Sequence, residues 1–309
     1  MSAIGFYLLN FCIRTIAFLP FGFLYFLADG LYYILFYVVG YREAVVRDNL
    51  SRAFPEKSPE ELLRIEKAFY RHLADMTVES LKMIHMTPKQ LSRRIPILNP
   101  ELLDKYRSEG RSIVAMGAHY CNWEWTLGIV PHLNYKTTGV YKPLNNKRFD
   151  RLVNQTRSRF GTEMVGMREV VRVLLKYKRD NTPTFNVFIA DQSPVWEEIQ
   201  FWTSFLNQVT PVYLGPEKLA RQFNMAVLFG KVNKTDRGRY SVELIPIEEN
   251  PLDTSEFEIT RKFFKLLEES ILEKPEFWLW SHRRWKHTRK REKEESKGIF
   301  RFAENNTRK

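Results

Sequence analysis

The chain has 309 residues, enough for one large domain or two small ones with a sizeable core, and it shows no internal repeat. Its two cysteines, Cys12 and Cys121, have no metal-type spacing, which argues against a disulfide scaffold or a zinc site and favours a reducing compartment. The formal net charge is +12, and half of this excess lies within residues 283–293, so nucleic acid, anionic lipid and an acidic carrier protein are all compatible partners.

The amino-terminal region is strongly apolar. Residues 3–39 are interrupted by little more than Asn10, Arg14 and Asp29. The uncharged run 15–28 is shorter than the roughly 20 residues that a helix needs to span a bilayer. We therefore expect either one tilted span around residues 15–39 or several interfacial helices in one leaflet; a buried core hairpin is the alternative without a membrane.

Basic residues directly after this region indicate its orientation. Tyr41-Arg42 and Arg47 follow the apolar segment, and positively charged flanks favour the cytoplasmic side of a membrane. Because no basic residues precede the first apolar ones, a cleavable signal peptide is not expected. The globular part is expected to face the cytoplasm.

A helix is expected over residues 58–86. Ser58-Pro59-Glu60-Glu61 is a helix start signal. Apolar residues then recur every three or four positions, at Leu62, Ile65, Phe69, Leu73 and Met76. Glu79 ends the polar face of this helix, and we interpret it either as a functional acid or as a solvated helical glutamate.

The stretch His119-Tyr120-Cys121-Asn122-Trp123-Glu124 is the most informative in the chain. It follows the apolar run 112–117, which predicts a buried strand. On a continuous helix His119 and Glu124 would lie about 140° apart and could not meet. We therefore expect a turn over 118–121 and a helix from about residue 123, with Asn122 as its N-cap.

These residue types suggest activation of an alcohol or of water. A neutral imidazole can take a proton from a hydroxyl near pH 7, and a carboxylate on its other ring nitrogen would fix the tautomer. We predict that His119 is the general base and Glu124 its orienting acid; a purely structural histidine and acid pair is the alternative. Cys121 is a rival nucleophile, although its place in the sequence assures no geometry.

From residue 112 onward, apolar runs alternate with helical patterns. This alternation predicts an α/β fold with a mixed central sheet flanked by helices, preceded by the apolar, membrane-anchoring helical segment. The expected strands are 112–117, 136–141, 184–190, 225–232 and 239–245, and the expected helices are 123–133, 147–160, 168–177, 214–223 and 255–273.

Polar residues follow two of these strands. Asp191-Gln192 come directly after strand 184–190, as the histidine motif comes after strand 112–117. Ligands of α/β sheets bind beyond the carboxyl ends of the strands, so His119, Glu124 and Asp191 could share a pocket. Arg157 and Arg159 could supply phosphate contacts there, or form an ordinary basic helix face.

Several blocks of the sequence, taken in their order along the chain, form a pattern that resembles one known family. They are the apolar amino terminus, Tyr41-Arg42 with Asn49-Leu50 and Ala53-Phe54-Pro55, Gly117 to Glu124, Tyr141-Lys142-Pro143-Leu144, Arg157-Ser158-Arg159-Phe160-Gly161, Ala190-Asp191-Gln192, and Trp278 to Trp285. In this order, over nearly the whole chain, they resemble the bacterial lipid A biosynthesis acyltransferases of the lauroyl and myristoyl transferase type, within the wider lysophospholipid acyltransferases.

The resemblance implies transfer of a fatty acyl group from an acyl-carrier-protein thioester to a lipid hydroxyl at the cytoplasmic face of the cell inner membrane. It implies direct transfer without metal, cofactor or covalent acyl-enzyme. His119 would be the base and Glu124 its partner, and Arg157 or backbone amides near Asn122 would stabilise the oxyanion. The substrate-binding residues would be Asn122, Arg157, Arg159, Asp191 and Gln192. The expected partners are acyl-carrier protein, the acceptor lipid and the inner membrane, and no nucleic acid.

One departure from the family pattern concerns the acceptor. Phe205-Leu206-Asn207 replaces a Phe-Phe-Gly-like turn of better-known members, in a region that would shape the acyl or acceptor pocket. A lipid A precursor, a phospholipid and an amino-lipid therefore all stay open as acceptors.

We expect three parts: a membrane anchor over 1–40, an acyltransferase domain over 41–285, and a basic, disordered tail over 286–309. Two other functions compete. One is a hydrolase in which His119 activates water, and the other is a non-enzymatic membrane protein whose basic tail binds lipid or nucleic acid. The chain lacks a Gly-x-Ser-x-Gly elbow, a paired-histidine zinc motif and a Gly-Lys-Ser/Thr loop, which disfavours the common hydrolase and nucleotide-dependent classes.

Overall fold

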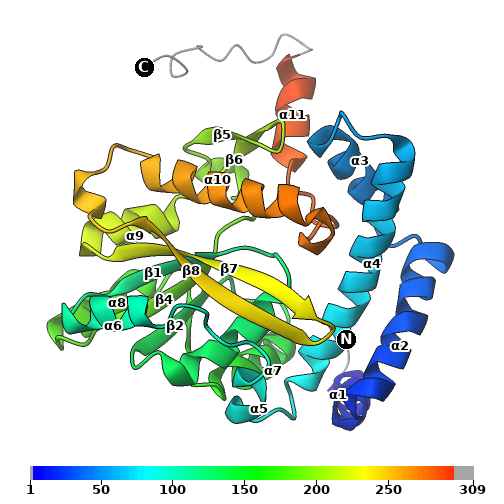
Figure 1. Cartoon of the computed structure of the whole chain (residues 1–309), viewed down its shortest axis with the longest axis horizontal. Coiled ribbons are helices and arrows are strands. Elements are labelled where there is room, and N and C mark those ends of the chain that lie inside the picture. The colour runs from blue at the N-terminus through cyan, green and yellow to red at the C-terminus, as the bar shows by residue number, and fades with distance from the viewer. Residues whose placement is uncertain (1–2, 296–309) are drawn as a thin grey trace.

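A six-stranded sheet with helices on both sides forms the centre of the computed structural model, which describes residues 3–295 (Figure 1). The strand order is β3-β2-β4-β1-β7-β8, and neighbouring strands run parallel except for the antiparallel pair β7 and β8. The expected mixed sheet flanked by helices is confirmed. The sheet contains β1 (Ile113–Gly117), β2 (Lys136–Tyr141), β3 (Glu163–Gly166), β4 (Thr184–Ile189), β7 (Ala226–Asp236) and β8 (Arg239–Glu248).

The central strand β1 shows why the sequence folds this way. It pairs with β4 on one edge and β7 on the other, and helices cover both faces of the sheet, so a parallel strand in that position requires a continuous apolar run. A separate two-stranded hairpin, β5 (Trp202–Phe205) and β6 (Gln208–Pro211), lies outside the sheet. Its turn holds Leu206 and Asn207 at positive φ.

The helix α4 (Pro59–Lys82) begins at the predicted signal. The Ser58 hydroxyl accepts from the Glu61 amide while the Glu61 carboxylate accepts from the Ser58 amide, which forms a complete capping box. The other helices before the sheet are α1 (Ala3–Phe18), α2 (Phe21–Tyr33), η1 (Ile34–Val38), α3 (Glu43–Ala53), α5 (Pro88–Ser92) and α6 (Glu101–Ser108). The later ones are η2 (Trp123–His132), α7 (Lys147–Ser158), α8 (Val170–Arg179), η3 (Trp196–Glu198), α9 (Gly215–Phe223), η4 (Pro251–Asp253), α10 (Glu258–Glu273), η5 (Pro275–Phe277) and α11 (Lys286–Glu295).

The apolar amino terminus forms helices α1 and α2, which lie against α4 at one end of the molecule (Figure 1). Leu24, Ala28 and Tyr32 of α2 are buried, so one face of this helix packs on the globular part. Over the described residues, Phe21–Val38 is the one helical segment long and apolar enough to cross a membrane, with a mean hydropathy of 1.5.

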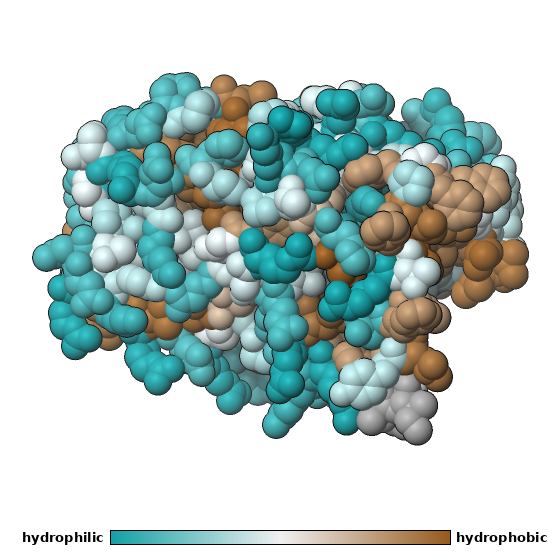
Figure 2. Space-filling view, turned by 90° about the horizontal axis from the view of Figure 1, so that it is seen from below, coloured by the Kyte–Doolittle hydropathy of each residue, from teal (hydrophilic) through white to brown (hydrophobic). Residues whose placement is uncertain are grey.

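The opposite faces of these helices are exposed and apolar, and Figure 2 shows brown side chains gathered at this end of the molecule. The large exposed side chains here are Tyr7, Leu8, Leu9, Phe11, Phe18, Phe23, Phe26, Tyr33, Ile34, Tyr37, Val38 and Val39. We call this set the N-terminal apolar face. Monomeric soluble proteins rarely expose so many large apolar groups together, so this face indicates an interaction surface.

The carboxyl-terminal basic segment differs from the disorder that we expected from residue 286. Residues 286–295 form helix α11, and residues 296–309 lie outside the described part of the chain. Arg289 of α11 pairs with Asp48 of α3 at 2.9 Å, and the Thr288 hydroxyl donates to the Val209 carbonyl. These long-range contacts order the helix, and composition alone does not reveal them.

Candidate active site

Parallel pairing of β1 and β4 brings the two polar strand ends together. Gly117 is in register with Ile189, so His119 and Asp191 follow neighbouring strands at the same edge of the sheet. His119 Nδ1 lies 2.7 Å from Asp191 Oδ1, and the His119 amide donates to Asp191 Oδ2 at 3.1 Å. The expected meeting of the two strand ends is therefore what the structure shows.

Asp191 is buried and fully engaged. Its carboxylate also accepts a hydrogen bond from the Trp278 indole at 2.9 Å. Burial raises the pKa of Asp191, but the charge of His119 and these hydrogen bonds outweigh burial and hold the pKa below its ordinary value. An ionised Asp191 fixes the proton of His119 on Nδ1, which leaves Nε2 as the basic atom.

The basic atom of His119 is within hydrogen-bond distance of a second polar group. Gln192 Nε2 lies 2.9 Å from His119 Nε2, and Gln192 itself is exposed. A substrate hydroxyl that reaches Nε2 would replace this amide contact.

Glu124 is placed differently from our expectation. Its carboxylate holds the Arg157 guanidinium with two hydrogen bonds, of 3.0 Å to Nε and 2.5 Å to Nη2, while the position on His119 Nδ1 belongs to Asp191. Arg157 lies at the end of α7 and Glu124 in the first turn of η2. Burial disfavours the charged guanidinium, but Glu124 outweighs this effect and raises the pKa of Arg157.

A cavity of about 1270 Å³ adjoins these groups. Its walls come from one face of the sheet, from η2 and from α7, and they are mainly apolar, with Ala115, Val187, Val232, Leu244 and Leu127 among them. His119, Glu124, Arg157 and Gln192 contribute polar atoms to the lining. Within residues 3–295, no group of three or more metal-ligating side chains could hold a metal ion.

Asn122 positions the histidine motif through hydrogen bonds and does not line this cavity. Its side chain caps η2 by accepting from the Trp125 amide, as predicted, and its amide donates to Glu79 at 2.6 Å. Glu79 is completely buried, which contradicts a solvated position, and it also accepts hydrogen bonds from Tyr25 and Tyr240. Asn122 and Glu79 therefore position the turn that carries His119.

Arg159 is separated from the group around His119. Its guanidinium donates to the carbonyl oxygens of Ile84 and Met86, and it lines a second, smaller cavity. Phe205 and Leu206 are buried in the core and, with Asn207, do not line the large cavity, so the hairpin turn does not shape it.

The rival nucleophile is poorly placed. Cys121 is buried, and burial raises the pKa of its thiol well above the ordinary range. A thiol that stays protonated at neutral pH is a weak nucleophile.

The segment after α10 contacts the histidine motif, which the sequence pattern did not predict. Its backbone bonds to the histidine motif, from the Leu279 amide to the His119 carbonyl at 3.0 Å and from the Cys121 amide to the Phe277 carbonyl at 2.9 Å. Arg284 is fully buried, its guanidinium has no hydrogen-bond partner among the described residues, and burial lowers its pKa to about 10. The sequence feature that could have indicated a buried position for this segment is its run of basic residues set among tryptophans.

Known proteins resemble the chain over most of its length. The family model of the bacterial lipid A biosynthesis acyltransferases matches residues 1–287. The lipid A biosynthesis palmitoleoyltransferase of Escherichia coli (strain K12) is 24% identical over 246 residues, 79% of each chain. The lauroyltransferase of lipid A biosynthesis from the same strain is 24% identical over 272 residues, 87% of each chain. A lipid A biosynthesis acyltransferase of Haemophilus influenzae is 23% identical over 278 residues. The chain therefore belongs to the bacterial lipid A biosynthesis acyltransferase family.

Proposed function

We propose that this acyltransferase moves a fatty acyl chain from an acyl-carrier-protein thioester to a hydroxyl of a lipid A precursor. The observation that carries the proposal is the 2.7 Å contact between His119 and an ionised Asp191 beside a large apolar cavity. Two relatives, which are named as lipid A palmitoleoyl and lauroyl transferases, support the acceptor class.

The reaction begins with His119 Nε2 taking the proton of the acceptor hydroxyl. The hydroxyl oxygen attacks the thioester carbonyl carbon and forms a tetrahedral oxyanion, while Asp191 stabilises the imidazolium. The oxyanion then re-forms the carbonyl and expels the carrier thiolate, which takes the proton from the imidazolium. The ester and the free carrier thiol leave, and His119 returns to its neutral state.

Arg157 is the group that we assign to the developing negative charge. It lines the same cavity as His119, and its two hydrogen bonds to Glu124 fix its orientation before substrate binds. A preorganised cation of this kind stabilises an oxyanion without reorganising during the reaction. Glu124 thus acts through Arg157 in this mechanism, whereas Asp191 acts through His119.

The apolar part of the cavity is assigned to the acyl chain. Burial of hydrocarbon contributes about 0.8 kcal/mol per CH₂, so an acyl chain of ordinary length gains several kcal/mol there. Because the cavity also borders α1 through Ile13, an acceptor can reach it from the N-terminal apolar face.

We assign the N-terminal apolar face to the inner membrane, with the sheet domain on the cytoplasmic side. The face of helix α2 that lies opposite the N-terminal apolar face packs along α4. Asp29 of α2 pairs with Arg237, which also pairs with Asp75. If α2 crossed the membrane, these charged groups would enter the hydrocarbon layer, where their burial costs free energy. The arrangement supports the interfacial form of attachment rather than a span.

Substrate tests decide the proposal. Detergent-purified protein is given labelled acyl-carrier protein or labelled acyl-coenzyme A, with lipid A precursors, lysophospholipids and amino-lipids as acceptors. Labelled ester on a lipid A precursor, with the carrier thioester preferred as donor, is expected. Release of free fatty acid alone would indicate a hydrolase, and transfer to another lipid would replace the acceptor class.

A further inference from the structure

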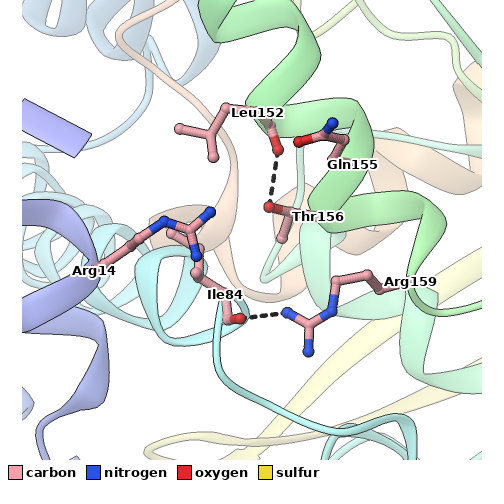
Figure 3. A pocket seen from close by; sticks show the side chains of 6 residues that line it. All are labelled: Arg14, Ile84, Leu152, Gln155, Thr156 and Arg159. Carbon is pink, nitrogen blue, oxygen red and sulfur yellow. Dashed lines mark hydrogen bonds between the residues drawn. The ribbon is translucent and has the colours of Figure 1, made fainter. Parts of the chain in front are cut away.

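A second cavity, of about 370 Å³, lies between α1 and α7. Its lining consists of Arg14, Ile84, Leu152, Gln155, Thr156 and Arg159 (Figure 3). Arg14 comes from α1 and Arg159 from the residue after α7, and their side chains project toward the space from opposite sides (Figure 3). Ile84 lies between them in the segment that follows α4.

The two cations differ in how they are held. Arg159 is fixed by the carbonyl oxygens of Ile84 and Met86, whereas the Arg14 guanidinium has no hydrogen bond or ion pair within residues 3–295. None of the six lining residues is acidic, so nothing in the lining neutralises the two charges. Two guanidinium groups, one anchored and one unpaired, form a site suited to a phosphate, which they can bind in a bidentate manner.

The position of Arg14 indicates where the phosphate comes from. It is the sole charged residue in the sequence between residues 3 and 28. Phe11 and Phe18, three residues before and four after, lie on the same face of α1 and are 71% and 76% exposed. A cation within an apolar helix face reaches the headgroup layer of a membrane, where lipid phosphates lie.

The second cavity adjoins the large one. Ile84, Leu152 and Thr156 line both, and Ile13 of α1 lines the large cavity beside Arg14 in the small one. A lipid whose hydroxyl reaches His119 can therefore place another part of its headgroup between Arg14 and Arg159.

We infer that Arg14 and Arg159 bind a lipid phosphate, namely a phosphate group carried by the acceptor itself. The inference rests on the proposed function for the identity of the acceptor. The phosphate of a surrounding bilayer lipid has the same chemistry, so the experiment includes an arm that separates the two sources.

The first arm measures binding without turnover. His119→Ala protein in detergent is titrated calorimetrically with a lipid A precursor and with the same lipid after enzymatic removal of its phosphates. We expect the phosphorylated lipid to bind about tenfold more tightly or better, the scale of a charge-assisted contact. Adding Arg14→Gln should abolish this preference, whereas Arg151→Gln, an exposed arginine of α7 outside both cavities, should preserve it.

Arg14→Gln is the decisive variant because, within residues 3–295, the Arg14 guanidinium makes no hydrogen bond or ion pair that the substitution would break, while Arg159→Gln would also free two carbonyl groups. Equal binding of the two lipids, or a preference that survives Arg14→Gln, would overturn the inference. This result would leave the proposed function intact as long as the wild-type protein transfers acyl groups.

The second arm separates the sources. Transfer to the phosphorylated acceptor is measured in micelles of dodecyl maltoside, a detergent without phosphate, and in the same micelles with added phosphatidylglycerol. A rise in KM for Arg14→Gln in both kinds of micelle supports the acceptor phosphate. A rise confined to the micelles that contain phosphatidylglycerol would overturn the assignment to the acceptor and give the site to the bilayer lipid.

Discussion

His119 is held by a carboxylate that stands 72 residues away in the sequence, not by the one five residues away. The sequence indicated that Asp191 could share a pocket with His119. It could not decide between Asp191 and Glu124, because that choice depends on the path of the turn over residues 118–122. Cys121 adopts a left-handed conformation there, with φ of 51°. Cysteine has no preference for this conformation, so the sequence did not predict it.

The pair of Glu124 and Arg157 supports the first residue-scale prediction. We expect Glu124→Gln and Arg157→Gln each to lower kcat by about 100-fold, the scale of losing one oxyanion donor. Because both act through one guanidinium, the double variant should be little worse than either single one. Steady-state kinetics measures this, with Arg151→Gln as the charge-matched control. Normal kcat in Arg157→Gln would remove Arg157 from the mechanism.

A second prediction concerns His282, which lies near Asp191 and Arg284. Burial lowers the pKa of His282 from 6.5 to about 4. Between these pH values the unfolded chain binds a proton at His282 that the folded chain does not. The free energy of unfolding is therefore undiminished above pH 6.5 and falls as the pH drops toward 4. This dependence amounts to roughly 3 kcal/mol at most, at about 1.4 kcal/mol per pH unit.

His282→Gln should make the stability profile less steep between pH 6.5 and pH 4, measured by urea unfolding at each pH. Part of the slope should stay, because burial also lowers the pKa of His72, to about 3. His132→Gln, which removes an exposed histidine, is the control and should leave the slope as it is. An unchanged slope in His282→Gln would show that His282 titrates normally.

At the scale of elements, Glu79 links three parts of the fold. Tyr25 of α2, Asn122 before η2 and Tyr240 of β8 all donate to its carboxylate, and Trp125 of η2 donates to its backbone carbonyl. This network holds the histidine motif against α4 and against the helix that carries part of the apolar face.

Glu79→Ala should therefore lower the free energy of unfolding by about 3 kcal/mol, because two buried donors, Asn122 and Tyr240, and the partly buried Tyr25 lose their acceptor. Glu60→Ala, an exposed position on the same helix, should change it by less than about 0.5 kcal/mol. Urea midpoints measure both. A normal midpoint for Glu79→Ala would mean that water or the neighbouring groups satisfy those donors.

The elements that the sequence predicted well are those with a long apolar period or run. Strand β2 has the predicted bounds, and β1, β4, α9 and α10 agree within about three residues. Strand β3 was missed because four residues at the sheet edge carry too short a pattern. The hairpin of β5 and β6 was missed because its turn uses Leu206 and Asn207 at positive φ without glycine.

For the whole molecule, the N-terminal apolar face is the feature behind our proposal that the reaction takes place at a membrane. Its exposed aromatic groups surround α1 and α2, and the large cavity opens toward α1 through Ile13. The composition of residues 3–39 predicted a membrane segment. Our proposal of interfacial attachment rests on the packing of α2 on α4, a tertiary contact that composition does not reveal.

We expect Phe18→Ser combined with Phe26→Ser to weaken binding to phospholipid vesicles by about tenfold or more, because two large apolar side chains no longer enter the interface. Vesicle flotation measures this. Leu175→Ser with Leu272→Ser removes exposed apolar side chains elsewhere and should leave binding unchanged. Equal loss in both double variants would contradict an interfacial role for α1 and α2.

The measurement that tests the central claim most directly is acyl transfer by His119→Ala and Asp191→Asn, compared with wild type under single-turnover conditions. The account predicts a loss of about 1,000-fold or more for His119→Ala and a large loss for Asp191→Asn, with circular dichroism and unfolding midpoints of the His119 variant unchanged. Transfer by folded His119→Ala at the wild-type rate would show that another group activates the acceptor hydroxyl.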